Sequence, residues 1–259
     1  MSPDSPGEAI RIAAVGDVHL AEDLRGRYRP CLERLSAEAD VLLVAGDLTQ
    51  HGRLDEAAVF AEEFSASDVP VVVVLGNHDY HSGQEDEIRT VIERAGIVVL
   101  EGEHHVVETD RGRVGIAGVK GFCLGFSGRC ASNFGEPEMK AFTGHGIRSA
   151  ELLRQAFDGL RSDLTVDVTV ALTHYAPVDN TLHGEPTEIW PFLGNYLLGE
   201  AIDAARADLA VHGHAHAGCE KGLTDDGTPV RNVAQPVIRS AYRVYDVQPA
   251  RALVTGGAS

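Results

Sequence analysis

The chain has 259 residues, 44% of them hydrophobic, and no apolar segment approaches the roughly 18 residues that a membrane-spanning helix needs. Its formal charge of −17 disfavours tight binding to nucleic-acid backbones or anionic membranes, unless a bound cation reverses the local field. The four cysteines are scattered without a C-x-x-C pair, so the sequence indicates neither a disulfide framework nor a zinc–thiolate site. We expect a single soluble domain over residues 1–259, which is cytoplasmic because no signal sequence is visible.

Apolar runs and helical spacing predict alternating strands and helices in the first hundred residues. Buried strands are expected over residues 10–15, 40–45, 69–75 and 97–100, and helices over residues 30–37, 54–64 and 85–95. This alternation predicts a parallel sheet with right-handed crossovers. From residue 105 onward, short strands and turns predict a second, antiparallel sheet, which is completed by a strand over residues 242–247.

Two segments in the second half of the chain lack a clear period. Residues 120–146 contain six glycines and four phenylalanines, and they predict a long irregular insertion that serves as a lid or binding loop. Residues 178–194 contain Trp190, which either lines a pocket or packs on the core. Helices over residues 147–160 and 197–207, with buried strands over 166–172 and 208–211, flank these loops.

Polar side chains follow five of the predicted strands, at the point where each strand ends. They are those of Asp17 and His19, Asp47, Asn77 with His78 and Asp79, His174, and His214 with His216. Ligands of open α/β sheets bind beyond the carboxyl ends of the strands. In extended backbone, residues two apart point to the same side, so Asp17 and His19 can share one ion. A helix-capping aspartate and a surface histidine explain this first pair about equally well.

Seven of these side chains offer oxygen or imidazole donors: Asp17, His19, Asp47, Asn77, His174, His214 and His216. Such donors suit divalent transition metals, whereas the number of imidazoles argues against magnesium or calcium. Seven donors exceed what one ion takes while keeping an open position, so two ions that share a carboxylate are expected. Two ions about 3.5 to 4 Å apart can clamp the attacking and leaving oxygens of a displacement at phosphorus.

The motifs Asp17-x-His19, Gly46-Asp47, Gly76-Asn77-His78-Asp79, His174 and Gly213-His214-x-His216 resemble those of the calcineurin-like metallophosphoesterase superfamily. All five blocks are present in order, and they span residues 16–216. The resemblance implies a four-layer α/β/β/α sandwich of two mixed sheets flanked by helices, with a dinuclear site at one end. It also implies that a hydroxide bridging the two metals is the nucleophile.

The same resemblance implies a role for each site residue. Asp17, His19 and His216 would hold the first ion, Asn77, His174 and His214 would hold the second, and Asp47 would bridge them. His78 would be the catalytic residue, protonating the leaving alkoxide, with Asp79 fixing its orientation. Manganese and iron are the ions we expect first, with zinc, cobalt and nickel as alternatives.

The leading hypothesis is a phosphodiesterase acting on small or nucleotide-like diesters, similar to small bacterial members of the superfamily. No arginine lies beside the five motifs, although Lys120, Arg129 and His81 could reach the pocket from loops. A phosphomonoesterase and a nuclease are the alternatives, and the acidic charge opposes the nuclease. A non-catalytic binding scaffold is a further alternative, but every ligand and His78 are retained. The sequence predicts no oligomeric state.

Overall fold

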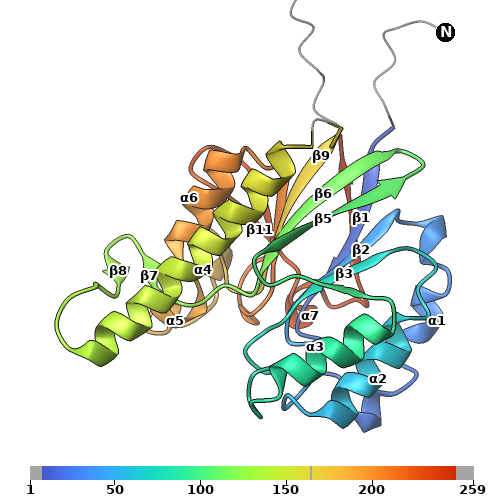
Figure 1. Ribbon diagram of the computed structural model, residues 1–259, viewed down its shortest axis with the longest axis horizontal. Helices are drawn as coiled ribbons and strands as arrows, with labels where there is room; N and C mark the ends of the chain where they lie inside the picture. The colour runs from blue at the N-terminus through green and yellow to red at the C-terminus, as the bar shows by residue number, and fades with distance from the viewer. Residues whose placement is uncertain (1–7, 164, 249–259) are drawn as a thin grey trace, which may run out of the picture.

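The computed structural model describes residues 8–163 and 165–248, so the C-terminal tail from residue 249 and the first seven residues lie outside it. Two β-sheets pack face to face, and each carries helices on its outer face (Figure 1). The expected four-layer α/β/β/α sandwich of two mixed sheets is confirmed. Within the described residues, no helix is both long enough and apolar enough to cross a bilayer.

The first sheet has the strand order β13-β1-β2-β3-β4. Its strands are β1 (Ile10–Val15), β2 (Val41–Ala45), β3 (Val71–Val74), β4 (Val98–Val99) and β13 (Arg243–Val247). The first four run parallel, whereas β13 pairs antiparallel with β1. The expectation that residues 242–247 complete the second sheet was therefore wrong, because β13 returns to the free edge of β1.

Short and long helices cover the outer face of this sheet. They are η1 (Glu22–Leu24), α1 (Arg29–Leu32), η2 (Leu35–Ala37), α2 (Leu54–Phe64) and α3 (Glu85–Arg94). The single helix predicted over residues 30–37 is two short pieces, since the backbone leaves helical geometry at Arg34 with φ −130° and ψ 14°. Leu32 and Leu35 are both buried, so the two short pieces still bring one apolar face to the core, and packing stabilises them where isolated short helices are marginal.

The second sheet has the strand order β11-β12-β10-β9-β6-β5. Its strands are β5 (Glu103–Thr109), β6 (Gly112–Val119), β9 (Val168–Thr173), β10 (Leu209–His212), β11 (Lys221–Leu223) and β12 (Pro229–Asn232). The sheet is mixed and not antiparallel throughout as predicted, because β6, β9, β10 and β12 run parallel to one another, whereas the edge strands β5 and β11 are antiparallel to their neighbours. Connections that contain helices join β6 to β9 and β9 to β10, and such crossovers allow parallel pairing.

The segment 120–146 is more regular than the sequence predicted. It contains a small hairpin of β7 (Gly125–Phe126) and β8 (Arg129–Cys130), and its last residues begin the long helix α4 (Pro137–Arg161). Pro137 occupies the start of the helix, where its missing N–H is not needed. The other elements of this half are η3 (Asn180–Leu182), α5 (Trp190–Leu193), α6 (Tyr196–Ala205) and α7 (Gln235–Ile238).

Three apolar layers hold the sandwich together. Valine, isoleucine and leucine side chains from both sheets fill the space between them. Outside the first sheet, Phe60 and Phe64 of α2 stack with ring centroids 4.3 Å apart, and outside the second sheet α4 and α6 contribute Leu153 and Leu198. The two sheets are therefore held in a fixed relation, and the carboxyl ends of β1, β2, β3, β9 and β10 meet at one end of the molecule.

Candidate metal centre

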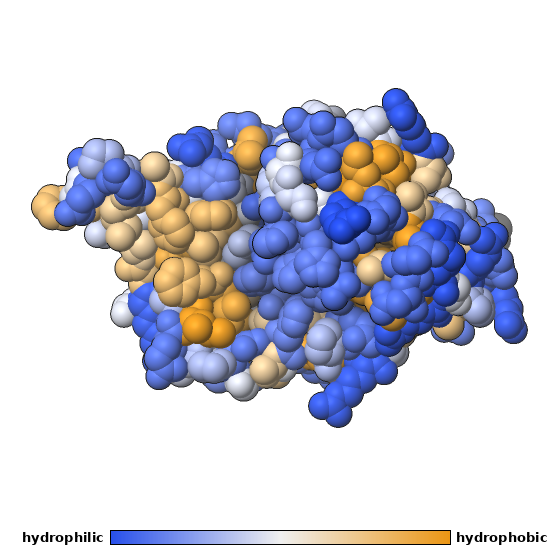
Figure 2. Space-filling view, turned by 90° about the horizontal axis from the view of Figure 1, so that it is seen from below, coloured by the Kyte–Doolittle hydropathy of each residue, from blue (hydrophilic) through white to orange (hydrophobic). Residues whose placement is uncertain are grey.

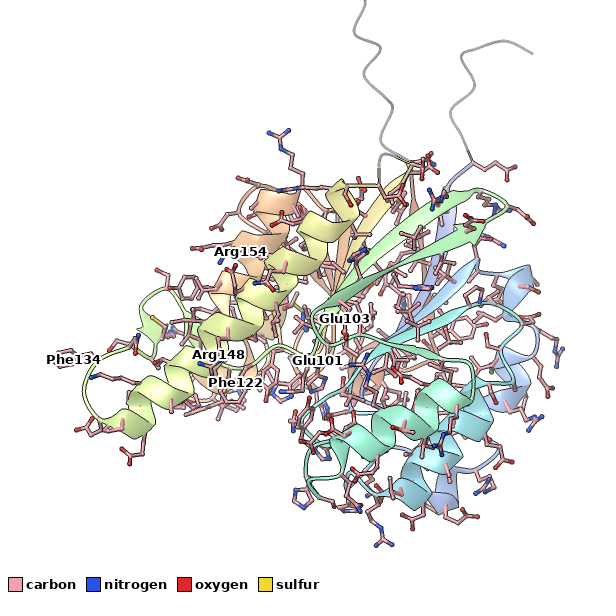
Figure 3. The ribbon with its side chains drawn as sticks, in the orientation of Figure 1. Glu101, Glu103, Phe122, Phe134, Arg148 and Arg154 are labelled. Atoms are coloured by element: carbon pink, nitrogen blue, oxygen red, sulfur yellow. The ribbon has the colours of Figure 1, made fainter. Side chains whose placement is uncertain are left out.

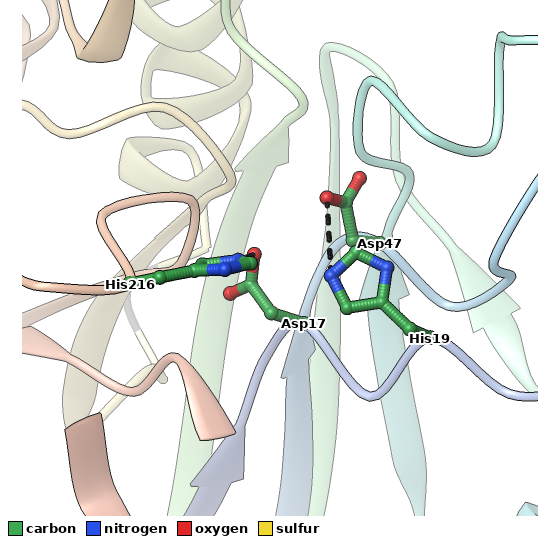
Figure 4. Close-up of side chains that lie close together, drawn as sticks. All are labelled: Asp17, His19, Asp47 and His216. Atoms are coloured by element: carbon green, nitrogen blue, oxygen red, sulfur yellow. Dashed lines mark hydrogen bonds and ion pairs between the residues drawn. The ribbon is translucent and has the colours of Figure 1, made fainter. Parts of the chain in front are cut away.

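The polar residues that follow the strands come together at this end of the sandwich. Two groups form, in each of which one potential ligand atom per residue lies within 4.8 Å of the others. The first group is Asp17, His19, Asp47 and His216, and the second is Asp47, His174 and His214. Asp47 belongs to both groups, as the bridging role requires. Figure 4 shows the first group, with side chains from three separate loops facing one centre.

The first group is partly open to solvent. The Nε2 atom of His216 lies 2.9 Å from Oδ1 of Asp17, and Nε2 of His19 lies 3.8 Å from Oδ2 of Asp47. The His216 side chain is 44% exposed, whereas the Asp17 side chain is fully buried. The carboxylate thus forms the floor of the group, and the His216 imidazole is reachable from outside.

The second group is more enclosed. His174 is buried, and its Nε2 atom lies 2.9 Å from Oδ1 of Asn77 and 3.4 Å from Oδ1 of Asp47. The rings of His174 and His214 are 4.8 Å apart. Asn77 therefore stands with the second group, where the family resemblance places it.

Backbone carbonyls set the orientation of two of these imidazoles. Nδ1 of His174 faces the carbonyl oxygen of Ala45 at 2.9 Å, and Nε2 of His214 faces that of Phe192 at 3.3 Å. An imidazole that donates to a carbonyl through one nitrogen keeps the lone pair of the other nitrogen for an ion. His174 would thus bind through Nε2 and His214 through Nδ1.

The protonation states suit a positively charged occupant. Burial lowers the pKa of His19 to about 4 and that of His214 to about 3, so both imidazoles are neutral near pH 7. Burial alone would raise the pKa of Asp17, but the hydrogen bond with His216 and the nearby histidines lower it to about 2. Within the described part of the chain, the buried Nδ1 of His19 has no hydrogen-bond partner. Neutral imidazoles and ionised carboxylates are the forms that bind metals. Burial raises the pKa of the shared carboxylate Asp47, and the hydrogen bond to Asp17 raises that of His216, so a bound cation would be needed to hold both in these forms. The donor types of the two groups fit two divalent ions.

Four of the site residues adopt left-handed backbone conformations. The φ angles are 56° at Asp17, 43° at His19, 51° at Asp47 and 69° at His214. Non-glycine residues rarely adopt such angles, and the strain gathers where side chains must be aimed at a site. Asp17 and His19 therefore converge through a sharp turn of the chain, and the extended backbone predicted for them was wrong.

Two glycines allow these turns to approach each other closely. A Cβ atom at Gly76 would collide with the backbone nitrogen and carboxylate of Asp47, and one at Gly213 would collide with the carboxylate of Asp17. The main-chain N–H of His214, next to Gly213, donates to Asp17 at 2.9 Å. The glycines in the Gly-Asn and Gly-His motifs thus make room for the carboxylates.

His78 lies at the rim of the site, with its side chain 43% exposed. Its ring is 4.4 Å from that of His19, and its Nε2 atom is 4.0 Å from Oδ2 of Asp47. Nδ1 of His78 faces the carbonyl oxygen of Gln50 at 2.7 Å. The Gln50 carbonyl therefore orients His78, and the expectation that Asp79 does so was wrong.

Asp79 instead holds two loops together. Its carboxylate is buried and accepts hydrogen bonds from the main-chain N–H groups of Leu48, Thr49 and Gly76, and from the Thr49 hydroxyl at 2.6 Å. These bonds join the loop after β2 to the loop after β3. Asp79 thereby fixes the separation of the Asp47 and Asn77 loops.

The loop cations named from the sequence do not join the metal groups. Lys120 is 7% exposed, and its ammonium lies 4.6 Å from the ring centroid of Tyr80 and 5.5 Å from that of Tyr175. The Arg129 guanidinium stacks 4.8 Å from the Trp190 ring. Helix and strand periodicity in the sequence could not predict the aromatic rings around Lys120, because Tyr80, Phe122 and Tyr175 come from three separate loops.

Comparisons with known proteins give the family of this chain and structures that share its fold. Residues 10–218 match the family model described as calcineurin-like phosphoesterase. A protein of Pseudoalteromonas sp. (strain SM9913), named probable cyclic nucleotide phosphodiesterase, is 30% identical over 119 residues, which are 40% of this chain and 44% of that protein. The match thus spans less than half the length of this curated relative.

Solved structures resemble the fold over most of the chain. Phosphopantetheinyl hydrolase from Mycobacterium tuberculosis superposes with a TM-score of 0.65 at 18% identity, covering 92% of this chain and 96% of that one. GAP50, the anchor in the inner membrane complex of Plasmodium, superposes with a TM-score of 0.53 at 11% identity, covering 88% and 72%. At these identities the likeness concerns the fold alone. With its family model matched over most of its length, the chain belongs to the calcineurin-like phosphoesterase family and is a metallophosphoesterase.

Proposed function

We propose that this protein is a dinuclear metal-dependent phosphodiesterase acting on small or nucleotide-like diesters. The observation that carries the proposal is the pair of donor groups that share Asp47 at the open end of the sandwich. The name of the partial relative from Pseudoalteromonas supports the diesterase class. When bound, two divalent ions would polarise the phosphate and lower the pKa of a shared water.

His78 has the geometry of a proton donor in this reaction. Its Nδ1–H donates to the Gln50 carbonyl, which aims Nε2 into the space beside His19 and Asp47. From there, a protonated imidazole can give its Nε2 proton to the oxygen of the departing alcohol. The partial exposure of His78 lets the ring regain a proton from solvent between turnovers.

The charges around the site favour a diester over a monoester. Among the described residues, the only ion-pair partners of Asp17 and Asp47 are histidines. A monoester brings one more negative charge, which such enzymes neutralise with additional cations, and the ammonium of Lys120 is enclosed by aromatic rings. A diester with one negative charge needs no such help.

The donor set suits divalent first-row metals, among which we propose manganese or iron as the native ions. Both candidate groups combine aspartate and histidine, and neither includes a cysteine. Carboxylate and imidazole donors bind several first-row metals, so availability in the cell selects among them. Metal analysis of the purified protein would identify the resident ions and their number.

A paired assay tests the proposal. The protein is stripped of metal and reloaded with manganese, and hydrolysis of bis(p-nitrophenyl) phosphate is compared with that of p-nitrophenyl phosphate. We expect the diester to be the better substrate by kcat/KM. Faster turnover of the monoester would replace the proposal with a phosphatase. Absence of turnover for both esters, with two ions bound, would overturn the catalytic assignment.

A further inference from the structure

Four aromatic residues lie beside the metal ligands, three of them in ring contact with one another and the fourth, Phe192, next to His214 through its backbone. The Tyr175 ring packs 4.5 Å from His214, the Phe122 ring lies 6.0 Å from Tyr175, and the Phe142 ring lies 5.2 Å from Phe122. The Phe192 carbonyl oxygen lies 3.3 Å from Nε2 of His214. We call Phe122, Phe142, Tyr175 and Phe192 the aromatic wall.

The wall lies on the side of the site where the second sheet's insertions gather. Figure 2 looks at the end of the molecule where the parallel strands end, and apolar side chains collect there beside a hydrophilic centre, on the side of β7, β8 and α5. Figure 3 places Phe122 between α4 and the strand ends. The Phe192 side chain is 57% exposed, while Phe122 and Phe142 are half-buried.

One phenylalanine beside the metal site, Phe192, is exposed. Packing in the folded chain does not explain Phe192, because more than half of its surface stays in water. Burying that apolar surface would stabilise the fold, so its exposure indicates another role. Among the described residues packed on these rings, Lys120 is buried behind Tyr80, Phe122 and Tyr175. The His145 ring lies 4.4 Å from that of Phe122, and partial burial lowers its pKa, which favours the neutral imidazole. The surface thus suits an uncharged, apolar group, and it reaches the site at His214.

We propose that the aromatic wall binds one ester substituent of the substrate, and that this substituent is apolar, either aromatic or aliphatic. The inference rests on the proposed function, because it assumes a phosphodiester held at the metal groups. A diester carries two substituents, so one can leave beside His78 while the other lies against the wall. Contact with aromatic faces would then supply binding energy in proportion to the apolar surface of that substituent.

A substrate series with one leaving group tests this inference. The substrates are methyl, butyl, octyl and phenyl p-nitrophenyl phosphodiesters, all of which release p-nitrophenol. We expect kcat/KM of the manganese-loaded protein to rise about tenfold or more from the methyl ester to the butyl and phenyl esters. Phe142→Ser and Phe192→Ser should each reduce this ratio severalfold, because they remove apolar contact without removing a metal ligand.

A matched control is offered by Leu223 in β11, which is 54% exposed and therefore resembles Phe192 in exposure. Leu223→Ser should keep the wild-type ratio. Bound metal is measured in every variant, because the Phe192 carbonyl also contacts His214; if Phe192→Ser loses metal, Phe142→Ser carries the test. If wild-type kcat/KM were the same for the methyl, butyl, octyl and phenyl esters, the inference would be overturned. It would also be overturned if Leu223→Ser reduced the butyl-to-methyl ratio as much as Phe142→Ser or Phe192→Ser does. Failure to hydrolyse even the methyl ester would instead count against the proposed function.

Discussion

The two sides of the open end of the sandwich are built in different ways. On one side, the metal ligands follow directly from strand ends, and Asp17, Asp47 and His174 are nearly or completely buried. On the other side, the aromatic wall comes from α4, α5 and the segments before them, and Phe192 is largely exposed. The rigid side suits the chemistry, which needs fixed geometry, and the inserted side suits recognition of the substrate's variable part.

The largest effect is expected at the residue shared by both metal groups. Asp47→Asn replaces a carboxylate that can bind through two oxygens with an amide that offers one. We expect loss of at least one ion and a fall in kcat/KM for the diester of about 10³-fold or more. Metal analysis and steady-state kinetics measure both effects. Asp110→Asn, in the hairpin turn between β5 and β6, is the matched control and should leave both unchanged.

The next effect separates catalysis from metal binding on the rigid side. His78→Asn removes the proposed proton donor but no metal ligand, so both ions should stay bound. Turnover of an alkyl diester should fall by about 10²- to 10⁴-fold, and turnover of a p-nitrophenyl ester should fall less, because p-nitrophenolate leaves without a proton. Equal losses for the two substrates would contradict the role. His104→Asn, on the exposed edge strand β5, is the control.

Asp79 tests how the rigid side is held together. Asp79→Ala would leave buried N–H groups of Leu48, Thr49 and Gly76 without their acceptor. We expect a loss of about 2 to 4 kcal/mol in the free energy of unfolding, because each unsatisfied buried donor is costly. Urea unfolding of the variant and the wild type gives the difference. An unchanged midpoint would show that water replaces the carboxylate.

The contrast between the two sides also explains what the sequence could predict. The strand ends of β1, β2, β3, β9 and β10 were close to their predicted positions, because buried parallel strands are apolar runs that stop where the site begins. Because the strand ends were predicted nearly correctly, Asp17, Asp47 and His174 could be identified from the sequence as candidate site residues. The roles of individual residues were harder to predict. His78 is oriented by the Gln50 carbonyl and not by Asp79, and hydrogen bonds to backbone carbonyls leave no pattern in the sequence.

The inserted side was predicted less well, for a different physical reason. Residues 137–146 begin α4, yet their glycines and aromatic residues show no helical period. Their helix is stabilised by packing against distant elements, including the Phe122 ring on Phe142. Likewise, β13 pairs with β1 across more than 200 residues of chain, and such a pairing is decided by which sheet edge is free. Local patterns cannot report contacts of this range.

The smallest effect is expected at Lys120, which lies between the two sides. Burial lowers the pKa of its ammonium, with Glu101 opposing the shift, so the charged form is disfavoured in the folded protein. The loss of folding stability from burying this ammonium is complete at pH values below the pKa of Lys120 in the folded protein. It shrinks as the pH rises through that pKa and vanishes above the ordinary pKa of lysine. We therefore expect Lys120→Met to raise the free energy of unfolding by about 1 kcal/mol at pH 7 and by less at pH 10.

Urea unfolding at both pH values measures this, with Lys140→Met on the exposed part of α4 as the control. A variant less stable than the wild type at both pH values would show that the contacts of the ammonium with Tyr80, Phe122 and Tyr175 outweigh its burial, and that a charge joins the two sides.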